Sequence, residues 1–120
     1  MNIEIHRIND LNVAELVSSE IIIKDIDSGI ELLGDLYYQD LDRVLVHEKN
    51  ITPDFFDLKN CMAGEILQKF ANYRVRLAMV GDFSKYTGNS IKAFIHESNR
   101  GHQVNFLPSR SEALKILSTK

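Results

Sequence analysis

The sequence feature that most constrains this fold is a repeated switch between short apolar runs and segments with helical spacing. Two of the runs, Val44–Val46 and Val75–Val80, are almost continuously apolar and have polar residues on both sides. Such runs are typical of strands that are covered on both faces in a parallel sheet. Because one helical segment separates the two runs, we expect adjacent central strands that are parallel and joined by a right-handed crossover.

The beginning of the chain has a different pattern, with polar and apolar residues in alternation. Ile3 and Ile5 share one face of the first predicted strand, which extends from Asn2 to Ile8. Asn9-Asp10 follows as a tight turn, because both residues tolerate left-handed backbone, and Val13 to Val17 forms the returning strand. The sequence therefore predicts an antiparallel hairpin at one edge of the sheet.

Local signals predict four helical regions. The first has a capping box at Ser28–Glu31, and Thr52-Pro53 begins the second as cap and first helical residue. The third is expected to end at Gly101 in the left-handed conformation, and a second capping box, Ser109–Glu112, opens the fourth. The stripe expected to face the core from the first helix consists of Ile26, Ile30, Leu33 and Tyr37, with Leu36 alongside.

These elements define an α/β fold with a small mixed, mostly parallel sheet, an N-terminal antiparallel hairpin and about four helices. The last predicted strand is Val104–Leu107, directly before the fourth helix. A length of 120 residues is the usual size of one domain, so residues 1–120 are predicted to form a single domain.

Composition narrows the classes of partner and compartment. The formal net charge is −3 and no basic cluster is present, so we expect no nucleic-acid partner. No run approaches the roughly 20 apolar residues of a membrane span, so no membrane partner is expected either. Cys61 is the only cysteine, which precludes an internal disulfide and fits a reducing, cytoplasmic location. Its place before an apolar helical stripe predicts a buried thiol.

One loop is a candidate ligand site. It follows the Val75–Val80 strand and leads into a helix, and this carboxyl edge of a parallel sheet is where α/β proteins bind ligands and anions. The favoured interpretation, however, is that the same residues only cap the helix, since the glycine spacing does not match a phosphate-binding Walker motif. The candidate residues are Asp82, Ser84, Lys85, Thr87, Asn89 and Ser90.

Other constellations have weaker support. His47, Asp82 and Ser84 could be arranged as a hydrolase triad, but no Gly-x-Ser-x-Gly elbow surrounds Ser84. The remaining histidines show no metal-ligand spacing, so we expect no catalytic, cofactor or metal site. Phe55-Phe56 is either an exposed docking motif or a pair in which one ring packs under the sheet while the other helps to cover the loop, and the second interpretation is favoured.

The element order at this length resembles the STAS domain of bacterial anti-sigma factor antagonists. The chain is also similar to an uncharacterised bacterial family, domain of unknown function 4180, over nearly its whole length. The segments that carry this second likeness are residues 51–58, 64–70, 73–75, 80–84 and 97–101. The STAS resemblance implies a fold and a general role in binding partners.

The chain departs from the STAS pattern at one functional position. Phosphorylated STAS regulators have an Asp-Ser dipeptide before a helix, and matching its Asp to Asp57 places Leu58 at the acceptor position. No hydroxyl is available there, so the phosphoserine switch does not carry over. The expected function is a non-enzymatic regulatory module that binds another protein or itself. A small-ligand or anion-binding protein using the Asp82–Ser90 loop is the alternative, and a hydrolase is a distant one.

Overall fold

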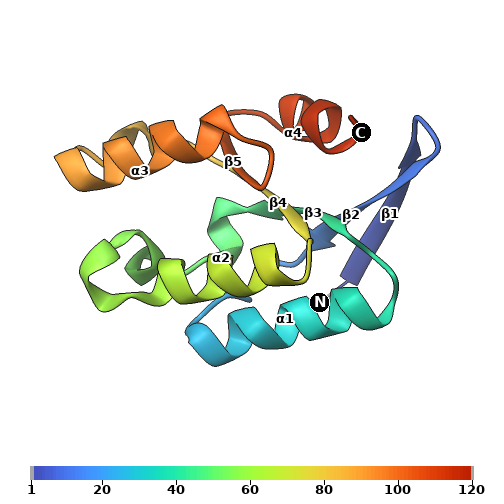
Figure 1. Cartoon of the computed structure of the whole chain (residues 1–120), viewed down its shortest axis with the longest axis horizontal. Helices are drawn as coiled ribbons and strands as arrows, with labels where there is room; N and C mark the ends of the chain where they lie inside the picture. The colour runs from blue at the N-terminus through green and yellow to red at the C-terminus, as the bar shows by residue number, and fades with distance from the viewer. Residues whose placement is uncertain (1, 120) are drawn as a thin grey trace.

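The computed structural model describes residues 2–119 and shows a mixed α/β fold (Figure 1). Short 3-10 turns lie between β3 and α2 and after β4. The strands are β1 (Asn2–Ile8), β2 (Leu11–Val17), β3 (Arg43–His47), β4 (Arg76–Val80) and β5 (Val104–Leu107), and the α-helices are α1 (Ile26–Tyr38), α2 (Met62–Asn72), α3 (Asn89–Arg100) and α4 (Arg110–Leu117).

The five strands form one sheet in the order β1-β2-β3-β4-β5. β1 is antiparallel to β2, and the other neighbours are parallel. The β3–β4 register runs from Arg43 opposite Arg76 to His47 opposite Val80. The predicted pairing of the two apolar runs as adjacent parallel strands is therefore confirmed.

The hairpin turn is also confirmed. Asn9 and Asp10 have φ angles of 52° and 63°, so both residues of the turn are left-handed. A two-residue turn of this type has the twist that antiparallel strands require, and the short polar side chains of Asn and Asp tolerate it. The hairpin projects at one end of the molecule (Figure 1).

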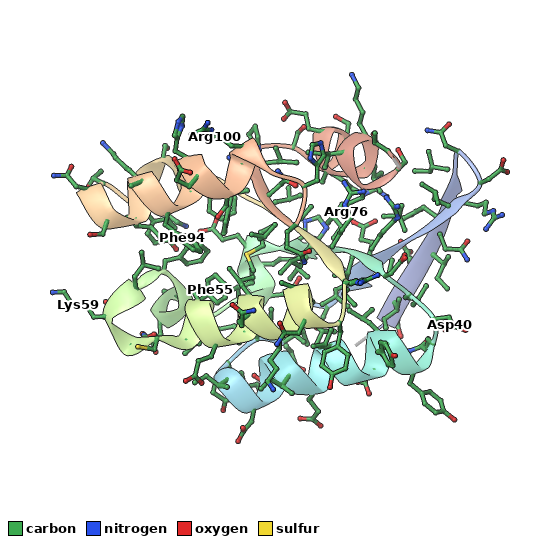
Figure 2. The ribbon with its side chains drawn as sticks, viewed as in Figure 1. Asp40, Phe55, Lys59, Arg76, Phe94 and Arg100 are labelled. Atoms are coloured by element: carbon green, nitrogen blue, oxygen red, sulfur yellow. The ribbon has the colours of Figure 1, made fainter. Side chains whose placement is uncertain are left out.

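Helices cover the two faces of the sheet unequally. The larger core lies on the face covered by α1, α2 and α3, and it includes Phe55, Ile66 and Phe70. Figure 2 shows Phe55 and Phe94 directed into this interior, whereas Lys59 lies at the surface. The opposite face is covered by α4, and its smaller core consists of Val13, Leu45, Ala78, Val80, Ala113 and Leu117.

The first helix begins earlier than the sequence predicts. Its cap is Asp25, whose carboxylate accepts a hydrogen bond of 2.8 Å from the backbone N–H of Ser28. The Ser28 hydroxyl in turn accepts from the Asp25 N–H at 3.0 Å, so Ser28 is the second partner of the capping box and not its cap. The face that packs inward is that of Gly29, Leu32, Leu33 and Leu36, whereas Tyr37 is 59% exposed. The prediction of Tyr37 as a core residue was wrong.

The segment before α2 differs from its prediction in length. Thr52 caps a helix with Pro53 at its first position, as expected, but this 3-10 helix ends at Phe56. A left-handed residue, Cys61 with φ of 65°, precedes α2. Its side chain is exposed, so the prediction of a buried thiol was wrong, because the turn directs the residue away from the core.

Two further expectations are settled by the backbone and by burial. Gly101 has φ of −105°, so the predicted left-handed end of α3 was wrong and the helix ends on extended backbone. Phe55 and Phe56 are 0% and 5% exposed, which confirms core packing over an exposed docking motif. Their rings meet edge to face with centroids 5.2 Å apart.

The buried face of α2 gives a test of the core. Phe70 is 1% exposed, so Phe70→Ala is expected to lower the free energy of unfolding by about 3–5 kcal/mol. Leu67 is only partly buried, and Leu67→Ala is expected to cost less than Phe70→Ala. Urea denaturation measures both, with Gln68→Ala on the exposed face as the control. A loss below about 1 kcal/mol for Phe70→Ala would contradict this packing.

Candidate functional site

The most unusual side chain in the molecule is a buried carboxylate, that of Glu15. It lies on β2 and is 4% exposed. Burying a charged group is costly unless the group is paired and hydrogen-bonded, so Glu15 needs compensating donors. The structure provides three.

Arg110, the first residue of α4, supplies the positive charge. Its Nε lies 3.0 and 2.9 Å from the two carboxylate oxygens of Glu15, and its Nη2 lies 2.8 Å from Oε1. His6 Nε2 is 2.8 Å from Oε1, and His47 Nε2 is 2.8 Å from Oε2. Both oxygens of Glu15 are thus engaged from two sides, by residues of β1, β3 and α4.

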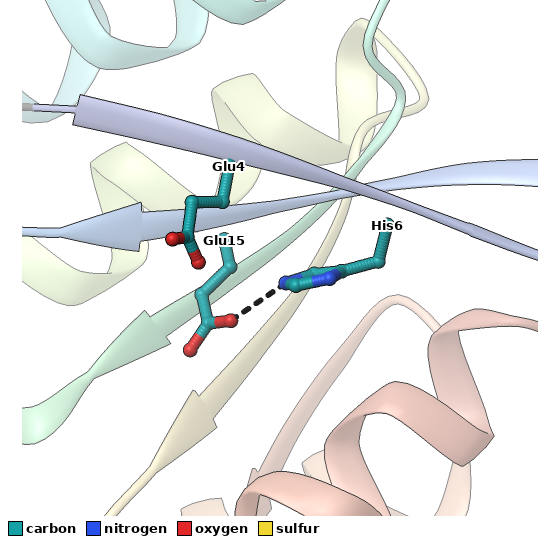
Figure 3. A group of neighbouring side chains, drawn as sticks. All are labelled: Glu4, His6 and Glu15. Carbon is teal, nitrogen blue, oxygen red and sulfur yellow. Dashed lines mark hydrogen bonds and ion pairs between the residues drawn. The ribbon is translucent and has the colours of Figure 1, made fainter.

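Strand register explains why these residues meet. Glu4 pairs with Glu15 across the hairpin, and side chains two residues apart share a face, so His6 lies on the same face as Glu4. Glu15 is also in register with Leu45, which places His47 on that face at the end of β3. Figure 3 shows Glu4 and Glu15 side by side, with the His6 ring directed at Glu15.

Local capping brings Arg110 to this face. Ser109 caps α4 by accepting a hydrogen bond from the Glu112 N–H, as the sequence predicted, so the helix begins directly over the sheet. Ala113 and Leu117 then pack against the strands and fix the orientation of α4. We call the group of Glu15, Arg110, His6 and His47 the Glu15 centre.

The Glu15 centre changes the acidity of its members. The hydrogen bonds from Arg110 lower the pKa of Glu15 to about 2, and those from the two histidines act in the same direction. Desolvation opposes this shift but is smaller than the effect of Arg110. The carboxylate in return raises the pKa of Arg110 above its usual value. Glu15 therefore stays charged across the physiological range.

A cleft of about 420 Å³ opens beside the Glu15 centre, at the carboxyl end of β2. This edge of a parallel sheet is a common place for ligands in α/β proteins. The cleft combines apolar wall, hydroxyls and charges of both signs. Its lining residues are Glu4, Glu15, Leu16, Val17, Ser18, Ser19, His47, Lys49 and Arg110.

The predicted ligand loop lies elsewhere, and its charges are paired within the protein. Asp82 accepts hydrogen bonds from the backbone N–H and the hydroxyl of Ser84, at 3.1 and 2.5 Å, and these bonds lower the pKa of Asp82. Lys85 forms an ion pair with Glu48. Thr87 is exposed, and Asn89 and Ser90 form the exposed start of α3. Anion binding by this loop stays a prediction.

The residues drawn as a hydrolase triad belong to two separate networks. His47 contacts Glu15, whereas Ser84 bonds to Asp82. Among residues 2–119, no hydrogen bond joins His47 to Asp82 or Ser84. The structure therefore gives these three residues no common arrangement.

Sequence reasoning did not single out Glu15 or Arg110. The available signal was a carboxylate inside the strand Val13–Val17, between residues that are otherwise apolar. A charge at an inward position requires a partner, but the partner lies 95 residues away in the sequence. Nothing local to Arg110 identifies it.

Fold and site together define an α/β protein with a mixed five-stranded sheet and a buried carboxylate held by an arginine and two histidines. The chain belongs to the family described as Domain of unknown function (DUF4180), whose model matches residues 8–117. Comparisons with curated proteins and with solved structures found no match. Within residues 2–119, no helix combines the length and apolar character needed to cross a membrane.

The lowered pKa of Glu15 predicts a specific dependence of stability on pH. A carboxyl whose pKa falls from 4.5 to about 2 on folding contributes stability that is fully present above about pH 5 and is lost as the pH falls toward 2. Its size is on the order of 3 kcal/mol. Glu15→Gln should lack this component, so its free energy of unfolding should change less between pH 5 and pH 2.5.

Urea denaturation across this pH range measures the difference. The matched control is Glu31→Gln, which replaces an exposed carboxylate on α1 and should retain the native pH dependence. Parallel pH profiles for the native protein and Glu15→Gln would contradict the assignment of Glu15 as the anchored anion.

Proposed function

We propose that this protein is a non-enzymatic regulatory module that works by binding protein chains, and that one partner is a second copy of itself, joined along β1. One observation carries the proposal. β1 is an edge strand of the sheet, and the outward-pointing backbone groups of two antiparallel copies of β1 can pair with each other around a two-fold axis. The STAS resemblance agrees with this, because STAS domains mostly act by binding partners.

The direction of the β1 backbone groups follows from the hairpin. Residues flanking a two-residue turn exchange both hydrogen bonds, and such pairs alternate along an antiparallel ladder. Ile8 flanks the turn, so the even-numbered residues of β1 bond to β2. Ile3, Ile5 and Arg7 therefore point their N–H and C=O groups away from the sheet. They form an unpaired edge that can accept another strand.

A copy of β1 fits this edge in one register. When two β1 strands run antiparallel around an axis at Ile5, Ile5 opposes the partner's Ile5 and Ile3 opposes the partner's Arg7. All three residues with outward backbone groups then lie in hydrogen-bonded pairs. The result is a continuous sheet of ten strands, five from each copy.

The side chains favour the same register. Ile5 is 55% exposed, a large apolar side chain on an edge strand, and pairing would bury it against its copy. On the other face, Glu4 comes next to the partner's His6, which places a carboxylate beside an imidazole ring. β1 pairs with β2 without interruption over 7 residues and contains no proline, so neither a bulge nor a proline interrupts this edge.

Regulation by phosphoserine is not part of the proposal. Leu58 stands where the STAS acceptor would be, and its side chain packs against the larger core. The adjacent Asp57 caps its own 3-10 turn by accepting from the Lys59 N–H. The regulatory event that we propose is association of protein chains at β1.

Sedimentation equilibrium tests the proposal. The native chain of 13.7 kDa is expected to show twice that mass at tens of micromolar. Ile5→Lys should shift the protein to the monomer, because two lysines would oppose each other at the axis. The matched control is Tyr38→Lys, which replaces a 91% exposed side chain on α1 and should leave the dimer intact.

Hydrogen exchange gives a residue-level measurement of the same contact. The amides of Ile3, Ile5 and Arg7 should become protected as the protein concentration rises, while those of Glu4 and His6 should be protected at all concentrations by β2. A native protein that is monomeric at these concentrations, or a dimer that survives Ile5→Lys, would overturn the proposal.

A further inference from the structure

Three side chains of the hairpin face are arranged as a set of metal ligands. One ligand atom from each of Glu4, His6 and Glu15 lies within 4.8 Å of the other two (Figure 3). Carboxylate oxygens and an imidazole nitrogen together are a donor set typical of divalent transition-metal ions such as zinc. All three residues come from β1 and β2, so the hairpin alone sets their positions.

Glu4 adds a second carboxylate beside the ion pair of Glu15 and Arg110. Arg110 neutralises Glu15, but within residues 2–119 Glu4 makes no side-chain hydrogen bond or ion pair. The two carboxylates therefore share one hydrogen-bonded guanidinium. A divalent cation would compensate both carboxylates together.

Arg110 stands where such an ion would bind. Its Nη2 lies 2.8 Å from Glu15 Oε1 and 3.3 Å from His6 Nε2, between the same two groups that the ion would contact. The Arg110 side chain is 49% exposed and borders the cleft, whereas the Glu15 side chain is 5% exposed and is held on β2. The guanidinium can move into the cleft, and the carboxylate stays in place.

His47 supports the carboxylate from its other side. Its Nε2 lies 2.8 Å from Glu15 Oε2, which orients the group and leaves Oε1 directed at His6. Ligating carboxylates are commonly held by such a second hydrogen bond. The cleft beside Glu4 and Glu15 gives solvent access to the remaining coordination position.

We propose that Glu4, His6 and Glu15 bind a divalent transition-metal ion of the zinc type, which displaces Arg110 from Glu15 and leaves a coordination position open to the cleft. Arg110 is then the internal cation that holds the site in the metal-free protein. His47 is a positioning residue.

Titration with Zn²⁺ followed by thermal unfolding tests the site. The native protein should be stabilised, with a rise in Tm on the order of 10 °C when the ion is at 100 times its Kd. Glu4→Gln and His6→Gln should each weaken Zn²⁺ binding by at least about tenfold, the size expected for loss of a ligand or its support. His96→Gln, which removes an exposed histidine on α3, is the control for binding at the surface.

Arg110→Met separates a metal site from a purely structural ion pair. This variant should be less stable than the native protein without metal, because Glu15 loses its cation. Zn²⁺ should bind it at least about tenfold more tightly and restore most of the lost Tm, because the competitor has been removed. The titrations are repeated in the Ile5→Lys background, so that the result does not depend on self-association.

Two results would overturn the proposal. One is no rise in Tm of the native protein with Zn²⁺ at up to millimolar concentrations. The other is a Zn²⁺ response that Glu4→Gln, His6→Gln and Arg110→Met leave unchanged, which would place the ion elsewhere.

Discussion

The contact between Glu15 and Arg110 is the interaction on which the second face of the sheet depends. An ion pair of this kind contributes little net stability by itself, but removing Arg110 would leave the buried carboxylate of Glu15 without its cation. Here the pair joins the second strand to the last helix across 95 residues of sequence, and His6 and His47 extend it to two more strands. Its value lies in position: it ties the start of α4 to the hairpin, in addition to the packing of Ala113 and Leu117.

The small apolar area beneath α4 explains why polar anchors matter there. Ala113 and Leu117 are the fully buried residues of the helix. Arg110 holds its start through Glu15, and two arginines hold its C-terminal end: Arg43 donates to the carbonyl of Leu117 at 2.7 Å and Arg76 donates to that of Ile116 at 2.9 Å. Cations at a helix C-terminus also interact favourably with its dipole. The larger core needs no such devices, since three helices cover it.

The parts of the fold that were predictable are those with local causes. Continuous apolar runs identified β3 and β4, and the Asn9-Asp10 turn followed from two residues that tolerate positive φ. The errors arose where a local signal had two solutions: Ser28 is a capping residue in either register, and only packing selects Asp25 as the cap. The Glu15 centre could not be predicted, because alternation in β2 shows that two faces exist and not which of them receives α4.

Glu4 and His6 take part in both proposals, which together imply that self-association and metal binding are coupled. In the paired sheet, Glu4 of one copy lies next to the partner's His6, and that contact uses the free carboxylate and the free imidazole ring. In the metal site the same carboxylate and the same ring nitrogen are ligands, and a ligating histidine must be deprotonated. Metal binding therefore occupies the Glu4 and His6 side chains that β1 pairing uses, and β1 pairing occupies the same side chains that the metal would need. Such coupling is reciprocal, so an ion that weakens pairing at β1 is itself bound less tightly by the dimer. The hairpin of this protein would then link the occupancy of a buried centre to the availability of its sheet edge.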